Sequence, residues 1–119
     1  MIHVLASIVI EEGKMPDVLK IYENFVPLVT GETGCLMYQP TLDVDTPIPT
    51  QVKDDNLVTV IEKWESMEAF NAHLNAPHVI QFRKEIKGIV KNISIKVLTE
   101  ANEKYHNAGQ QYGFGESLR

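Results

Sequence analysis

Four segments of the chain have the hydrophobic pattern of β-strands. Residues 2–10 are dense in isoleucine and valine, and residues 57–64 carry apolar side chains on both alternating faces. Residues 35–42 and 93–98 alternate between apolar and polar positions. Short runs of this kind, rich in β-branched residues, predict strands. Pro40 predicts that its strand lies at an edge or contains a bulge, because proline has no N–H to donate.

Two further segments have helical periodicity. Pro16 suits the first turn of a helix, where a missing N–H costs nothing, and Ser66 is a good N-cap for a second helix. That second helix carries Phe70, His73 and Leu74 on one face. Pro77 predicts a break, followed by another helical piece. The apolar positions of the first helix are Val18, Ile21, Tyr22, Phe25, Leu28 and Val29, and those of the last piece are Ile80, Phe82, Ile86, Ile89 and Val90.

The order strand, helix, strand, strand, helix, strand predicts an α+β fold of the ferredoxin-like, split βαβ type. In this fold two helices cover one face of a four-stranded antiparallel sheet. We expect one domain over residues 1–98, with a loop or hairpin arm at 43–56 that contains two prolines and four aspartates. Residues 99–119 turn polar and Gly-rich, and we expect a tail that is ordered only if it docks.

The same pattern predicts a homodimer. The first and third strands are apolar on both faces, yet the helices can cover only one face of the sheet. The second face would leave a large exposed apolar patch, which monomers rarely tolerate. A second copy of the sheet, related by two-fold symmetry, is the simplest cover.

Composition excludes several classes of partner. The 119 residues carry a net charge of −5, and the basic residues form no run, so we expect neither nucleic acid nor a membrane as partner. No apolar stretch approaches the roughly 18 residues that span a bilayer, and we see no signal peptide in the first residues. A single cysteine fits a reducing compartment, and we expect a cytoplasmic protein.

His73 is the candidate for chemistry, because it lies on the apolar face of its helix. One interpretation is a core histidine bonded to a backbone carbonyl or to Glu62. The other is a general base or acid in a pocket between helix and sheet, since an imidazole titrates near neutral pH. Glu62 lies on a mostly apolar strand face and needs a partner. That partner is His73 if the face meets the helix, or a basic residue of a second subunit if it meets a dimer interface.

The residues expected to line a pocket around His73 are Glu62, Trp64, Tyr38, Phe70, His78 and Phe82. The aromatic members also suit simple packing. His73 and His78 are five apart, not the four that places two histidines on one helix face. No third ligand stands near them in sequence, so we expect no metal site. The chain also shows no nucleotide-binding loop, and we expect no haem or flavin.

The segment VIEKWESMEAFNAHLNAPHVIQF resembles the antibiotic biosynthesis monooxygenase family, including its quinol-monooxygenase-like members. The shared features are the strand ending in Glu62 and Trp64, the helix opening SMEAF, and the HxxxPH run from His73 to His78. The opening IHVLASIVIEEGK and the strand GCLMYQ are also similar, so that the resemblance covers residues 1–98. It implies a dimeric α+β barrel of two ferredoxin-like units.

The resemblance also implies an activity. Some members of the family oxidise quinols or polyketide aromatics with dioxygen and without metal, flavin or haem. Such a reaction asks the protein for a base, an apolar cavity and hydrogen bonds to the aromatic oxygens. His73 would be the base, with a small aromatic substrate and dioxygen as its partners. Two alternatives stay open: a proton-shuttling isomerase of a sugar-derived metabolite, which shares the HxxxPH run, and a ligand-binding dimer without catalysis.

Overall fold

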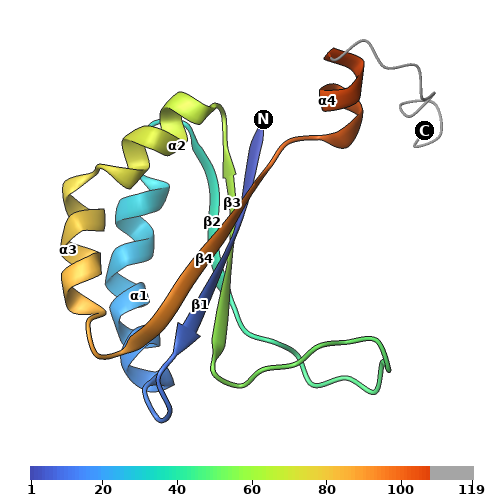
Figure 1. Ribbon diagram of the computed structural model, residues 1–119. Coiled ribbons are helices and arrows are strands. Elements are labelled where there is room, and N and C mark those ends of the chain that lie inside the picture. Colours follow the sequence, from blue (N-terminus) through green and yellow to red (C-terminus); the bar gives the residue numbers. More distant parts are fainter. Residues whose placement is uncertain (108–119) are drawn as a thin grey trace.

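A computed structural model describes residues 1–107 of the protein (Figure 1). Its elements are β1 (Ile2–Ile10), α1 (Met15–Thr30), β2 (Cys35–Thr41), β3 (Leu57–Trp64), α2 (Met67–Leu74), α3 (Pro77–Glu85), β4 (Val90–Leu98) and α4 (Ala101–Asn107). The four strands form one antiparallel sheet in the order β2-β3-β1-β4. The ferredoxin-like α+β fold is therefore confirmed. Pro40 lies on β2, which is an edge strand as predicted.

The helices α1, α2 and α3 lie together on one face of the sheet (Figure 1). The core fills the space between this helical layer and the sheet. On β1 and β3 the residues that face the helices alternate with exposed or half-buried ones, as a half-buried strand requires. The buried apolar residues of the sheet are Val4, Ala6, Ile8, Ile10, Tyr38, Val58, Val60 and Trp64, and those of the helical layer are Val18, Tyr22, Phe25, Val29, Phe70, Val79, Phe82 and Ile86.

The second helical segment is interrupted where Pro77 predicted it. α2 begins after Ser66, whose Oγ accepts a hydrogen bond from the backbone N–H of Ala69 at 3.1 Å. α3 then begins at Pro77 itself, which occupies the first helical position. Ile80 was expected in the core and is instead 46% exposed, while Val79 is buried. Val79, Phe82 and Ile86, at spacings of three and four residues, form the buried face of this segment, and Ile80 lies beside that face.

The opposite face of the sheet carries no helix (Figure 1). Leu5 of β1 lies beside Ile61 of β3 on this face, and both are more than a third exposed. Met37 and Leu98 add apolar surface from the two edge strands, with 40% exposure each. The face is mixed, because residues such as Lys96 share it. A second apolar strip lies on β4, on the same side as the helices but beyond their cover: Ile93, Ile95 and Val97.

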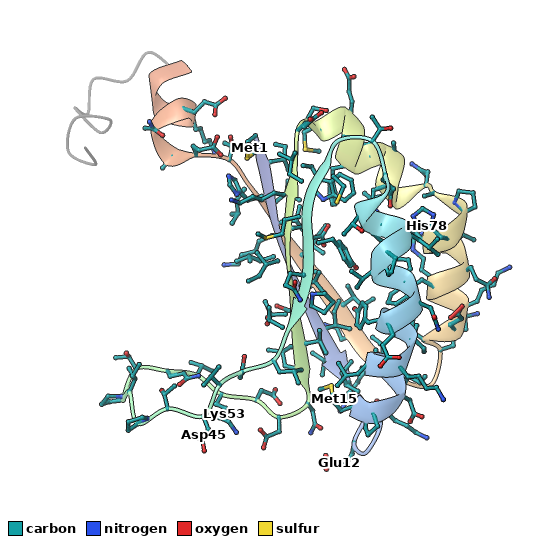
Figure 2. All side chains as sticks on the ribbon, turned by 180° about the vertical axis from the view of Figure 1, so that it is seen from behind. Met1, Glu12, Met15, Asp45, Lys53 and His78 are labelled. Atoms are coloured by element: carbon teal, nitrogen blue, oxygen red, sulfur yellow. The ribbon has the colours of Figure 1, made fainter. Side chains whose placement is uncertain are left out.

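Two segments project from the body of the molecule. Residues 42–56 form an extended arm that leaves the sheet at the end opposite α2, with Asp45 and Lys53 on it (Figures 1 and 2). This agrees with the predicted loop or hairpin arm. The helix α4 lies away from the helical layer, within the range predicted as a tail, and residues 108–119 of that prediction lie outside the described residues. Among residues 1–107, no helix has the length and apolar character needed to cross a membrane.

Candidate functional site

His73 lies between α2 and the sheet, as its place on the helix predicted. Because it follows Phe70 by three residues, both point from α2 towards the sheet. His73 is 5% exposed. Its ring centroid is 4.7 Å from that of Trp64, 5.8 Å from that of Tyr38 and 6.1 Å from that of Phe70. The imidazole is therefore enclosed by three of the aromatic residues that the sequence placed around it.

The hydrogen-bond partner of His73 is Glu32, which sequence reasoning missed. Its Nδ1 lies 2.8 Å from Oε2 of Glu32, in the turn between α1 and β2. The pairing with Glu62, expected if this strand face met the helix, does not occur. Glu32 stands 41 residues before His73, so no local spacing could reveal it. The available signal was a carboxylate between two glycines, Gly31 and Gly34, at the end of an apolar helix.

His78 reaches the same carboxylate oxygen. Its Nε2 lies 2.7 Å from Oε2 of Glu32. The chain turns at Asn75 and Ala76 before α3 begins, so two histidines five residues apart converge although a continuous helix would separate them. His78 occupies the first turn of α3, at the end of the helical layer (Figure 2). The side chains are 7% exposed for His73, 13% for Glu32 and 22% for His78.

These contacts determine where the imidazole protons lie. A carboxylate oxygen can only accept hydrogen bonds. Nδ1 of His73 therefore carries a proton, and in the neutral ring Nε2 is the free, basic nitrogen. Burial lowers the pKa of His73 below its ordinary value, and the hydrogen bond with Glu32 opposes that change. His73 is thus neutral, with one defined tautomer, at physiological pH.

Glu62 lies on the sheet face that meets the helices, which answers the question that the sequence left open. It is 4% exposed, and its Oε1 accepts a hydrogen bond from Nε1 of Trp64 at 3.0 Å. The two residues are two apart on β3 and so share one face. Burial raises the pKa of the Glu62 carboxyl to about 7; the bond from Trp64 lowers it, and the charge of Glu32 raises it. Glu62 can therefore be a neutral acid near physiological pH.

Two tyrosines complete the polar part of the interior. Tyr38 lies beside Glu62 in the pairing of β2 with β3. The sequence pattern assigned Tyr22 only to the apolar stripe of α1, yet its buried hydroxyl has no hydrogen-bond partner among the described residues. Burial raises the pKa of both phenols well above the ordinary value, and the charge of Glu62 raises both further. Both hydroxyls therefore stay protonated and can donate hydrogen bonds.

Phe82 and His78 meet at a different point of the helical layer. Phe82 stacks on Phe25 with 4.1 Å between ring centroids, and His78 lies 5.9 Å from Phe25. A hollow of about 80 Å³ opens beside these three rings. Ligand pockets for small molecules usually measure about 300 Å³ or more, so this hollow is smaller than a typical ligand pocket. Phe82 is thus separate from the group around His73, and His78 joins the two.

A larger hollow lies between α3 and β4. Its volume is about 370 Å³, with the basic side chains Arg83, Lys87 and Lys91 at its wall and apolar residues such as Ile86 and Ile93 beside them. The guanidinium of Arg83 also donates to the carbonyl of Leu74, at the end of α2. None of the residues predicted for the site lines this hollow.

Comparison of the chain with known proteins identifies its family. A family model described as antibiotic biosynthesis monooxygenase matches residues 1–85. The chain is 32% identical over 100 residues to a protein of Escherichia coli K12 named probable quinol monooxygenase YgiN, a match that covers 82% of this chain and 96% of the relative. The relative from Shigella flexneri with the same name matches to the same extent.

Solved structures show the same fold. The crystal structure of PA3566 from Pseudomonas aeruginosa superposes with a TM-score of 0.71 at 23% identity, over 83% of this chain and 92% of that one. Rv0793 from Mycobacterium tuberculosis gives a TM-score of 0.70 at 16% identity, over 83% and 93% of the two chains. The fold, the matched model over residues 1–85 and the 32% identical relative agree. The chain therefore belongs to the antibiotic biosynthesis monooxygenase family.

Proposed function

We propose that the protein is a cofactor-independent monooxygenase that oxidises a small aromatic substrate of the quinol type with dioxygen. The observation that carries the proposal is the imidazole of His73, fixed by Glu32 in one tautomer and enclosed by aromatic rings. The family supports the reaction class, and the relatives named as quinol monooxygenases support the substrate class.

The reaction begins with a proton transfer. Because Nδ1 of His73 is bonded to Glu32, Nε2 accepts the proton of a substrate hydroxyl, as in other histidine bases oriented by a carboxylate. The resulting phenolate is electron-rich and reduces dioxygen. For a hydroquinone, one oxygen atom enters the ring and the other leaves as water, giving a hydroxyquinone. The substrate supplies all four electrons, so that no external reductant is needed.

The neighbouring polar groups bind the substrate oxygens. Glu62 in its neutral form donates a hydrogen bond through the oxygen that Trp64 does not use. The hydroxyls of Tyr38 and Tyr22 are further donors from the sheet and from α1. Trp64 and Phe70 provide apolar contact for a ring. A donor set of this kind stabilises the negative charge that develops on the substrate oxygen.

An oxygen electrode tests the reaction class. Purified protein is mixed with a soluble hydroquinone, and oxygen uptake is compared with spontaneous oxidation of the hydroquinone in the same buffer. The proposal predicts uptake in proportion to protein concentration, and incorporation of one ¹⁸O atom from ¹⁸O₂ into the product. Across a panel of benzo- and naphthohydroquinones, uptake that never exceeds the spontaneous rate would exclude a quinol monooxygenase. It would favour the isomerase or the binding protein.

We also propose that two copies of the chain form a homodimer through the sheet face that carries no helix. Leu5, Ile61, Met37 and Leu98 expose apolar surface on this face, from all four strands. Contiguous apolar patches of this kind favour burial in an assembly. The α+β barrel expected from the family resemblance would place one site in each subunit.

A further inference from the structure

We propose that the cluster of Glu32, His73 and His78 binds a divalent transition-metal ion, with Zn²⁺ as its best-fitting occupant. The ligand atoms are Oε2 of Glu32, Nδ1 of His73 and Nε2 of His78, and all three lie within 4.8 Å of one another. They come from three places in the chain: the turn after α1, the last turn of α2 and the first turn of α3. Metal binding by this cluster does not depend on the proposed oxygenase function.

The three ligand atoms are close enough to share one ion after a small adjustment. Oε2 of Glu32 is 2.8 Å from the His73 nitrogen and 2.7 Å from the His78 nitrogen. Zinc binds imidazole nitrogen and carboxylate oxygen at about 2.0–2.2 Å, usually with tetrahedral angles. Ligand atoms around such an ion are therefore roughly 3.3 Å apart. Small rotations of the His78 and Glu32 side chains, which are the more exposed two, can lengthen the present separations of 2.7 and 2.8 Å by roughly 0.5 Å to reach this value.

The ligand types select the class of ion. Two imidazoles and one carboxylate are the protein ligands of many zinc sites that keep one position open. Magnesium and calcium prefer sites made wholly of oxygen, and the two nitrogens argue against them. The fourth position would be taken by water, because the His78 side of the cluster is 22% exposed. The ion would be held near the surface and not deep in the core.

The surroundings hold the ligands in place before an ion arrives. His73 is packed against Trp64 and Tyr38, which limits rotation of its ring. His78 is fixed by the start of α3 at Pro77 and by contact with Phe25. Ordered ligands lose little conformational entropy on binding. Preorganisation of this kind raises metal affinity.

An ion in the cluster would change the state of His73. In the ion-free protein the imidazole proton is on Nδ1, and Nε2 is basic. An ion bound to Nδ1 forces the proton onto Nε2, so that this nitrogen can no longer accept one. The metal-bound protein would then lack its base. This consequence rests on the proposed function, whereas the binding itself does not.

Isothermal titration of the EDTA-treated, dialysed protein with ZnCl₂ tests the proposal. We expect one Zn²⁺ per chain with micromolar or tighter affinity. Glu32→Gln and His78→Gln should each weaken binding by about 100-fold, since the loss of even an outer-shell partner costs roughly 10–100-fold. Co²⁺ gives a second readout, because its visible absorption bands report nitrogen and oxygen ligands in tetrahedral geometry.

The matched control is His3→Gln. His3 also contacts a carboxylate, Glu100, at 2.6 Å, but on β1, and among the side chains that the structure describes no second histidine joins this pair. This variant should bind Zn²⁺ as the wild type does. Circular dichroism verifies that each variant is folded. His78→Gln is the variant least expected to disturb folding, because His78 is the most exposed of the three ligands. Absence of binding by the wild type at 100 µM Zn²⁺, or equal affinity in wild type and His78→Gln, would overturn the site.

Oxygen uptake then separates the two proposals. If Zn²⁺ binds the cluster and stops hydroquinone-dependent uptake at one equivalent per chain, both proposals are supported. If Zn²⁺ binds as predicted but the protein shows no uptake with any hydroquinone, the metal site stands and the oxygenase is refuted. If the protein consumes oxygen with a hydroquinone but does not bind Zn²⁺, the oxygenase stands and the metal site is refuted.

Discussion

Replacing Glu62 by glutamine should remove a pH-dependent part of the protein's stability. Burial raises the pKa of Glu62 from its ordinary value of 4.5 to about 7 in the folded protein. A folded-state pKa above the unfolded one means that folding favours the neutral carboxyl. This stabilisation is complete below pH 4.5 and is lost as the pH rises through 7.

The size of the effect follows from the two pKa values. Each tenfold change in a protonation equilibrium corresponds to about 1.4 kcal/mol. Full ionisation of Glu62 therefore lowers the free energy of unfolding by about 3 kcal/mol, of which about 2–3 kcal/mol falls between pH 5 and pH 8. Glutamine keeps a neutral group of similar shape, and its amide oxygen can still accept the hydrogen bond from Trp64.

Urea unfolding at pH 5, 6, 7 and 8, at one fixed protein concentration, measures this difference. Other titrating groups are common to both proteins, so the quantity of interest is the free energy of unfolding of the Glu62→Gln variant minus that of the wild type. It should rise by about 2–3 kcal/mol from pH 5 to pH 8. Trp64 is the single tryptophan and contacts Glu62 directly, so its fluorescence should titrate near pH 7 in the wild type and not in the variant. Parallel stability curves and a flat fluorescence titration would refute a buried carboxyl with a raised pKa.

Three further results are expected. Ser66→Ala removes the side-chain bond to the N–H of Ala69 and should lower stability by about 1 kcal/mol in urea unfolding; an unchanged midpoint would mean that the cap contributes nothing. Gly34 and Gly13 both have positive φ, but a Cβ at Gly34 would lie 2.5 Å from Cβ of Ala69, whereas a Cβ at Gly13 meets nothing within 4 Å. Gly13→Ala should therefore lower the free energy of unfolding by about 1 kcal/mol, and Gly34→Ala should lower it by about 1–3 kcal/mol more. Equal losses in the two variants would show that the close approach of Gly34 to Ala69 has no effect on stability. Light scattering at micromolar concentration should give twice the chain mass of 13.4 kDa, and a wild-type protein that is monomeric in this measurement would exclude the proposed dimer. Val9→Asp, on the helix-free face of β1, should dissociate or unfold the dimer.

The fold could be predicted from the sequence because its signals are local. The alternation on β1 and β3, the N-cap at Ser66 and the break at Pro77 each act within a few residues. The order of these elements leaves few topologies. Ile80 shows the limit of this reasoning, because an apolar side chain alone did not reveal that Val79, and not Ile80, shares the buried face of Phe82 and Ile86.

The candidate site could be predicted only in part. His73, Trp64, Tyr38 and Phe70 meet as expected, because all four lie on faces that turn towards the same core. The contact of Glu32 with His73 could not be predicted, since it depends on how the turn after α1 lies against α2 and α3. Because Glu32 is the hydrogen-bond partner of His73, the predicted pair of Glu62 and His73 does not form. Glu32 also contacts His78 and so joins the two histidines in one cluster. Tertiary contacts over 41 and 46 residues determine such pairings, and periodicity does not record them.

The role of His73 as the base is the central claim, and the turnover of His73→Gln tests it most directly. Glutamine is neutral, polar and close to histidine in size, so the melting temperature should stay close to that of the wild type. With a hydroquinone that the wild type oxidises, kcat should fall by about a hundredfold or more, the usual contribution of a positioned acid–base group. A stably folded His73→Gln protein that consumes oxygen at the wild-type rate would contradict the account.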